Sequence, residues 1–154
     1  VPSLDALVAP VGGGGLMAGC STVARTLFPG MAIIGVEAET AQDTYLSLQK
    51  GERVHIPPPT TIADGIRTTA PGELTFPILK ENLTDVALVS DDEIRQAIVT
   101  LIEKAHTLAE GAGAAGLAGA VRSKAAIQGK KVVIVVTVGN ITLPQLEEAL
   151  RTSR

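Results

Sequence analysis

The 154-residue chain has one cysteine and no tryptophan, and aromatic residues make up only 2% of it. A single cysteine excludes a disulfide framework and is typical of a reducing compartment, so we expect a cytoplasmic location. No apolar run reaches the roughly 18 residues of a membrane span, and no signal peptide is recognisable at the start. The 13 basic residues are outnumbered by 16 acidic ones, and the formal charge of −3 argues against general nucleic-acid binding.

The composition that is present suits a single folded domain. Hydrophobic residues make up 45% of the chain and the mean hydropathy is +0.31, which provides enough apolar material for a core at this length. The first residue is Val1 rather than methionine, and a strand-like run begins almost at once. We therefore expect the chain to be a piece of a longer protein.

Short apolar runs alternate with helix-like runs along the chain. Strands are expected at 5–10, 31–36, 85–89 and 131–137, and helices at 16–27, 41–49, 111–126 and 143–151, with a loop-like stretch at 51–72. Ser90 and Glu93 form a capping box that opens one more helix. The run 131–137 is apolar on both faces, as a central strand of a parallel sheet must be. The pattern predicts an α/β fold of three layers, a mainly parallel twisted sheet flanked by helices.

Four consecutive glycines, Gly12–Gly15, separate the first expected strand from the first expected helix. Glycine loses more conformational entropy on ordering than other residues, so four in succession are costly. A glycine-rich turn at the start of a helix directs several main-chain N–H groups at one point, beside the positive end of the helix dipole. That arrangement favours an anion, usually a phosphate. A tight turn that merely lets the helix approach the sheet would explain one glycine but not four.

Two nucleotide motifs compete for this loop. A nucleotide P-loop needs Gly-Lys-Ser/Thr at its end, but the apolar Leu16 follows the last glycine, which excludes it. The dinucleotide fingerprint fits better, because Gly13, Gly15 and Ala18 have its spacing and Glu37 ends the next strand where a ribose ligand would lie. A dinucleotide-binding module is therefore an alternative, as is a non-catalytic assembly domain.

Beyond the glycines, motifs along nearly the whole chain resemble, in order, those of fold-type II pyridoxal-phosphate enzymes, in particular threonine dehydratase (threonine/serine ammonia-lyase) and serine racemase. They are PVGGGGL at 10–16, IGVEA at 34–38, TIADGI at 61–66, VSDDEI at 89–94, AEGAGA at 109–114 and VGNI at 138–141. The wording PGELT at 71–75 and AEGAG at 109–113 leans toward the catabolic-type threonine dehydratases. The resemblance implies the large-domain part of the tryptophan synthase β-like fold, with pyridoxal 5′-phosphate as cofactor.

The resemblance also implies residue roles. Main-chain N–H groups of the loop hold the cofactor phosphate, and they belong to Gly12, Gly13, Gly14, Gly15 and Leu16. Thr137 lies against the pyridine nitrogen, where a neutral hydroxyl does not force that nitrogen to be protonated. Val138 stands where the family usually has a glycine, which predicts a narrower pocket or an altered turn. Segments that border cofactor and substrate imply four second-rank site residues, Asp64, Gly65, Glu110 and Asn140.

A divalent cation is a further implication. Serine racemase-like members bind it through a glutamate, a main-chain carbonyl four residues on and an aspartate two beyond, and this spacing falls here on Glu37, Ala41 and Asp43. Two carboxylates and a carbonyl suit a hard cation such as Mg²⁺, Ca²⁺ or Mn²⁺. The competing interpretation is a helix N-terminus at which the dipole alone favours acidic residues.

The family attaches its cofactor to a lysine in a Ser-x-Lys motif, and none of the six lysines lies in such a setting. We therefore expect residues 1–154 to be the C-terminal portion of the catalytic core, without the N-terminal half, and inactive alone. The implied parent activity is β-elimination from L-threonine or L-serine, giving a 2-oxo acid and ammonia as in isoleucine biosynthesis. Serine racemization is the alternative. The implied partners are a small amino acid and either a second copy or the missing half, with no nucleic acid and no membrane.

Overall fold

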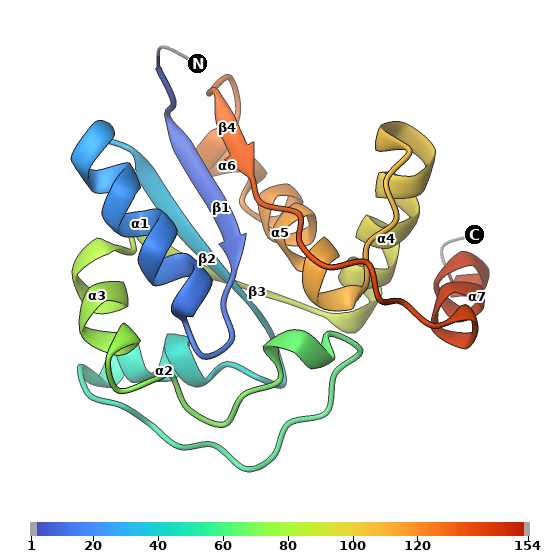
Figure 1. The fold of residues 1–154 in the computed structure, drawn as a ribbon, viewed down its shortest axis with the longest axis horizontal. Coiled ribbons are helices and arrows are strands. Elements are labelled where there is room, and N and C mark those ends of the chain that lie inside the picture. The colour runs from blue at the N-terminus through green and yellow to red at the C-terminus, as the bar shows by residue number, and fades with distance from the viewer. Residues whose placement is uncertain (1–2, 153–154) are drawn as a thin grey trace.

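The structure is a computed structural model of the chain and describes residues 3–152. Within these residues a parallel sheet runs in the order β3-β2-β1-β4, formed by β1 (Ala6–Pro10), β2 (Ala32–Ala38), β3 (Asp85–Val89) and β4 (Val132–Ile134). Because every pairing is parallel, the carboxyl ends of all strands lie at one end of the sheet. Figure 1 shows the long 51–72 segment passing that end.

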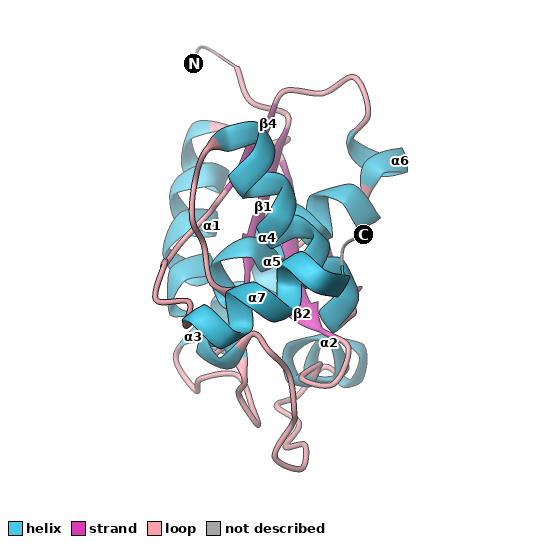
Figure 2. Ribbon diagram, turned by 90° about the vertical axis from the view of Figure 1, so that its right-hand side faces the viewer, coloured by secondary structure: helices cyan, strands magenta, loops and turns pink. Residues whose placement is uncertain are grey.

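Helices cover both faces of the sheet (Figures 1 and 2). On one face α1 (Gly15–Leu27) packs against α3 (Thr75–Asn82), and on the other α4 (Asp91–Ala105) packs against α5 (Gly111–Arg122). The remaining elements are α2 (Asp43–Lys50), the 3-10 helix η1 (Asp64–Ile66), α6 (Lys124–Ile127) and α7 (Leu143–Thr152). No helix within residues 3–152 combines the length and apolar character needed to cross a membrane.

The strands sort their side chains onto the two faces by alternation. In β1, Leu7 and Ala9 join the core beneath α1, whereas Val8 joins the core beneath α5. The neighbouring strand β2 alternates in the same way. Ile33 pairs with Leu7 and joins the core beneath α1, and Ile34 pairs with Val8 and joins the core beneath α5. This burial on both faces confirms the predicted α/β fold of three layers.

Helix α5 approaches the sheet unusually closely, along a row of glycines on one of its faces. A Cβ atom at Gly113 would overlap the carbonyl oxygen of Thr137, and one at Gly116 would lie 2.5 Å from the carbonyl oxygen of Val135. A Cβ at Gly119 would overlap a methyl group of Val36. The glycines therefore set the distance between α5 and the strands.

Three sequence predictions on the elements differ from the structure. Of the run predicted as a strand at 131–137 only Val132–Ile134 forms β4, which pairs only with β1 among the described residues and lies at an edge rather than the centre. Apolar residues on both faces of a strand show that other elements pack above and below it. They do not show whether another strand pairs with it on each side. The helix predicted for 111–126 ends at Arg122, and Ser123 separates it from α6. Helix α3 is not anticipated, since Pro77 obscures it, although proline is tolerated in a first turn.

The capping box is confirmed at the start of α4. The N–H of Glu93 donates to Oγ of Ser90 at 3.2 Å, and the N–H of Ser90 donates to Oε2 of Glu93 at 2.8 Å. These reciprocal bonds satisfy N–H groups that a helix start otherwise leaves without a partner, and they fix where the chain turns from β3 into α4.

Candidate functional site

The glycine loop connects the carboxyl end of β1 to the first turn of α1. Gly14 is the N-cap residue, with a φ of 89°, a left-handed conformation that favours glycine. A Cβ atom there would also lie 2.8 Å from both Oγ1 of Thr75 and Cδ1 of Leu79. Two separate constraints, backbone conformation and close packing on α3, therefore require glycine at position 14.

The main-chain N–H groups of this loop have no acceptor within residues 3–152. The N–H of Val11 donates to the carbonyl of Val36 at 2.8 Å, and that of Ala18 donates to the carbonyl of Gly14 at 2.8 Å. Between them, over residues 12–17, no N–H group donates to another group of the described chain. These groups surround the positive end of the α1 dipole, and the loop carries no cationic side chain. The arrangement is that of an anion-binding helix N-terminus.

A cavity of about 280 Å³ opens over this loop and gathers residues from four distant segments. The predicted site residues that line it are Gly12, Gly13, Gly14, Gly15, Leu16, Gly65, Glu110 and Thr137. Two second-rank residues do not line it, Asp64, which is exposed on η1, and Asn140. The cavity lies at the carboxyl ends of the strands, where ligands of open parallel sheets bind.

The far wall of the cavity is a turn held against the start of α5. The N–H of Glu110 donates to the carbonyl of Val138 at 3.1 Å, and Oε2 of Glu110 accepts the N–H of Asn140 at 3.0 Å. Val138 has a φ of 41°, a left-handed conformation that a β-branched residue rarely adopts. Val138 therefore has a backbone conformation that glycine adopts readily, and Asn140 contacts Glu110 without lining the cavity.

Thr137 precedes this turn and lines the cavity, half-buried. Its hydroxyl makes no hydrogen bond with any group in residues 3–152. A hydroxyl without a partner can donate to, or accept from, a ligand placed in the cavity. No lysine is among the lining residues in this part of the chain.

Sequence reasoning missed several residues of the cavity wall. Ile66 and Ala112 supply apolar surface from η1 and α5, and no periodicity in the sequence marks them as site residues. It also missed Thr75, whose hydroxyl reaches the glycine loop from α3. The one sequence feature that could have pointed to Thr75 is the segment PGELT at 71–75, which resembles the catabolic-type threonine dehydratases but was given no role at the site.

The three residues of the implied cation site lie outside this cavity, at the end of β2. The N–H groups of Thr44 and Tyr45 donate to Oε1 and Oε2 of Glu37, each at 2.8 Å, so Glu37 caps the first turn of α2. Asp43 accepts from Oγ1 of Thr68 at 3.1 Å. Ala41 is buried beside them. The helix-capping interpretation accounts for Glu37.

The electrostatics of this pair are unusual, because both carboxyl groups are buried. Burial, together with the charge of Asp43, raises the pKa of Glu37 from 4.5 to about 8. Burial also raises the pKa of Asp43 above its ordinary value. No lysine or arginine of residues 3–152 forms an ion pair with either carboxylate. The same residues contain no cluster of three or more histidine, cysteine, aspartate or glutamate side chains able to hold a metal.

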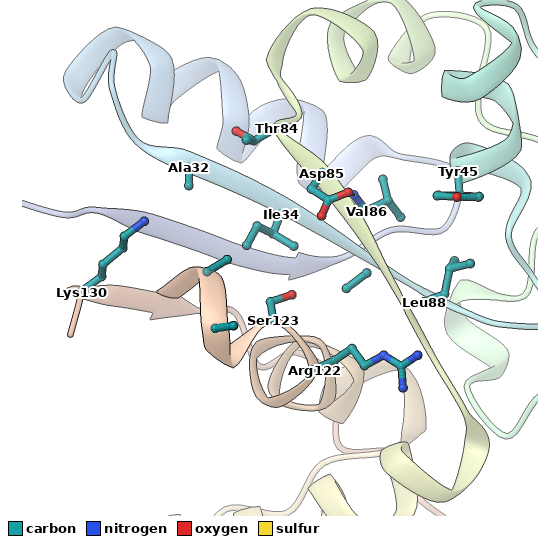
Figure 3. A pocket seen from close by; sticks show the side chains of 13 residues that line it. Ala32, Ile34, Tyr45, Thr84, Asp85, Val86, Leu88, Arg122, Ser123 and Lys130 are labelled. Carbon is teal, nitrogen blue, oxygen red and sulfur yellow. The ribbon is translucent and has the colours of Figure 1, made fainter. Parts of the chain in front are cut away.

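A larger cavity, about 760 Å³, lies between β3 and the segment from the end of α5 to α6, and charged side chains are among its lining residues (Figure 3). The residues that line it include the charged Asp85, Arg122 and Lys130, together with Ala32 of β2. Its lining includes Asp85 and Leu88, near the two ends of β3, so this cavity runs along β3 and shares no lining residue with the glycine-loop cavity. None of the predicted site residues lines it. The glycine-loop cavity is therefore the candidate site.

Fold and site together define an α/β protein with main-chain N–H groups gathered at a helix start in a geometry suited to an anion. Residues 1–138 match the family described as pyridoxal-phosphate dependent enzymes, and the chain belongs to that family. The family assignment confirms the resemblance seen in the motifs. It also favours pyridoxal phosphate over the dinucleotide that the glycine spacing left open.

Individual relatives carry more specific names. The chain is 43% identical to an L-threo-3-hydroxyaspartate ammonia-lyase of Saccharomyces cerevisiae, over 93% of the chain and 44% of that protein. It is 42% identical to a serine racemase of Dictyostelium discoideum, over 97% of the chain and 47% of that protein. The processed form of threonine deaminase isoform 2 from Solanum lycopersicum superposes with a TM-score of 0.94 at 32% identity, covering 99% of the chain and 45% of that structure. The chain thus spans less than half the length of these relatives.

Proposed function

We propose that residues 1–154 are the C-terminal, phosphate-binding portion of the catalytic core of a pyridoxal-phosphate-dependent ammonia-lyase. The proposed reaction of the whole enzyme is β-elimination from L-threonine, giving 2-oxobutanoate and ammonia, or from L-serine, giving pyruvate and ammonia. Its proposed setting is isoleucine biosynthesis in the cytoplasm. The observation that carries the proposal is the row of unpartnered N–H groups at 12–17 in a protein of this family.

The proposed task of the glycine loop is to hold the cofactor phosphate. The N–H groups from Gly12 to Leu16 would donate to the phosphate oxygens, and the α1 dipole would favour the negative charge. Each hydrogen bond to a charged acceptor contributes about 1.5–3 kcal/mol. Main-chain dipoles bind the dianion without the desolvation of a lysine or arginine, which fits the absence of such a side chain in this loop.

The proposed task of Thr137 is to meet the pyridine nitrogen with its free hydroxyl. When bound, pyridoxal phosphate supplies an electron sink that stabilises the negative charge left at the substrate Cα once its proton is removed. Thr137 is neutral, so it does not impose a proton on the ring nitrogen, and the sink stays moderate. Glu110 would keep the adjoining turn in place through its bonds to Val138 and Asn140.

The covalent lysine of the active enzyme is proposed to come from residues outside this chain. Support comes from the cavity, whose lining includes no lysine among residues 3–152. We expect the chain to bind the cofactor without turnover and to associate either with the remainder of the core or with a second copy. The amino-acid substrate would enter the cavity completed in this way.

The test is a titration of the chain with pyridoxal 5′-phosphate, followed by absorbance and by thermal unfolding. We expect binding that inorganic phosphate competes with and that Gly14→Ala abolishes, because its methyl group would clash with Thr75 and Leu79. Gly30→Ala is the matched control, since no atom lies within 4 Å of a Cβ built there. A change in NADH fluorescence on mixing, without any response to pyridoxal phosphate, would overturn the proposal in favour of a dinucleotide site.

A serine racemase-type activity is the second candidate, and the Glu37 site is the observation that favours it. Two buried carboxyl groups that form no ion pair with any lysine or arginine of residues 3–152 have the oxygen chemistry that Mg²⁺, Ca²⁺ or Mn²⁺ prefers. We propose that such a cation binds Glu37, Asp43 and the carbonyl of Ala41. Millimolar Ca²⁺ should then raise the melting temperature of the chain but not that of Asp43→Asn. Equal melting temperatures with Ca²⁺ and with EDTA would refute the cation site.

A further inference from the structure

A loop of four glycines binds an anion well only if something outside the loop orders it. Glycine residues populate both signs of φ, so the peptide units between them can rotate by half a turn at little cost. A peptide that turned over would present a carbonyl oxygen to the phosphate instead of an N–H group. The glycine loop therefore needs a clamp on at least one of its peptide units.

The structure contains such a clamp on the peptide between Gly13 and Gly14. The carbonyl oxygen of Gly13 accepts the hydroxyl of Thr75 at 2.6 Å and the N–H of Gly72 at 3.1 Å. A carbonyl oxygen has two lone pairs, so both are used. In a planar trans peptide the C=O and N–H bonds point in opposite directions. Holding the Gly13 carbonyl toward Thr75 therefore turns the N–H of Gly14 away from α3.

The clamp rests on a rigid support. Thr75 is the first residue of α3, and the same helix places Leu79 in the core beneath α1 with no exposed surface. Gly72 lies close to the loop as well, because a Cβ atom there would lie 3.0 Å from the Gly13 carbonyl oxygen and 2.8 Å from Oγ1 of Thr75. The clamp thus links two helices on the same face of the sheet through one peptide of the loop.

We infer that Thr75 is a positioning residue for phosphate binding, which orients the N–H groups of the glycine loop through its bond to the Gly13 carbonyl. This inference rests on the proposed function, because it assigns a role at the same site. It gives the PGELT segment a physical task that its sequence alone does not reveal. Thr75 does not line the cavity and acts only through the loop.

The experiment compares pyridoxal 5′-phosphate binding by the chain and three variants, using calorimetry and the ³¹P resonance of the bound phosphate. Thr75→Val keeps the shape of the side chain but removes the hydroxyl, and Thr75→Ser keeps the hydroxyl. Thr40→Val is the matched control, because the Thr40 hydroxyl also donates to a main-chain carbonyl at 2.6 Å, that of Thr60. Loss of the bond at Thr75 should weaken binding about tenfold and shift the ³¹P resonance.

The expected pattern is weaker binding in Thr75→Val, recovery in Thr75→Ser and no change in Thr40→Val. If the unaltered chain binds and Thr75→Val binds equally well with the same ³¹P resonance, the positioning role is overturned while the proposed function stands. If the unaltered chain does not bind, the proposed function itself fails. Should Thr75→Val not fold, Gly72→Ala tests the same clamp by crowding the hydroxyl, and unchanged binding there would also overturn it.

Discussion

Replacing Gly113 with alanine should destabilise the fold strongly, although alanine is the better helix former. In an unobstructed helix interior the change would contribute about 1 kcal/mol of stability. At position 113 the new methyl group would overlap the Thr137 carbonyl oxygen and lie 2.6 Å from that of Val138. Ordinary contact begins at 3.4 Å, and both obstacles are main-chain atoms that cannot rotate away. Overpacking of this kind costs about 1–3 kcal/mol and occasionally more.

We therefore expect Gly113→Ala to lower the free energy of unfolding by about 2 kcal/mol, the upper end of the overpacking cost less the gain in helix propensity, against the roughly 5–15 kcal/mol typical of a domain. The measurement is urea unfolding followed by circular dichroism. Gly19→Ala is the control, because Gly19 is also inside a helix and a Cβ built there meets no atom within 4 Å. It should raise the free energy of unfolding by about 0.5–1 kcal/mol.

Gly119→Ala separates a clash with side chains from a clash with the main chain. The three atoms nearest to its methyl group would all belong to the side chain of Val36, so Val36→Ala should recover part of the loss in a double-mutant cycle. No single side-chain substitution should recover the stability lost in Gly113→Ala, because the atoms that its methyl group meets belong to the main chain. If Gly113→Ala proves as stable as Gly19→Ala, α5 does not pack against the carbonyl groups of Thr137 and Val138, and the close packing of the cavity wall is refuted.

Three further predictions follow from other parts of the molecule. Val138→Gly should raise the free energy of unfolding by about 1 kcal/mol in denaturant titrations, because it relieves the left-handed strain at a side chain that is 53% exposed. In EDTA, the melting temperature should fall as pH rises from 4.5 toward 8, because Glu37 loses its proton in the unfolded chain at a lower pH than in the folded chain, where burial raises its pKa to about 8. In Glu37→Gln the melting temperature should depend less on pH. Light scattering should detect association that Leu27→Lys weakens, because Leu27 is 64% exposed in an apolar groove of about 430 Å³; a monodisperse monomer would contradict this.

Much of the fold follows from local sequence patterns. The run 85–89 forms a strand with the predicted limits, and the capping box at Ser90 opens α4, because both signals depend on neighbouring residues. The position of β4 in the sheet does not follow, since the apolar pattern is the same for an edge strand and a central one. Helix α3 was also missed, because Pro77 is read as a breaker unless its place in the first turn is known.

The sequence by itself determined the chemistry of the site. Four glycines before a helix indicate a main-chain anion site, and the motif order indicates the pyridoxal-phosphate family, because both depend only on residue type and spacing. Only the tertiary structure decided which residues share the cavity. It separated Glu37 from the glycine loop and joined Thr75 to it across 62 residues, because parallel strands bring distant segments to one end of the sheet.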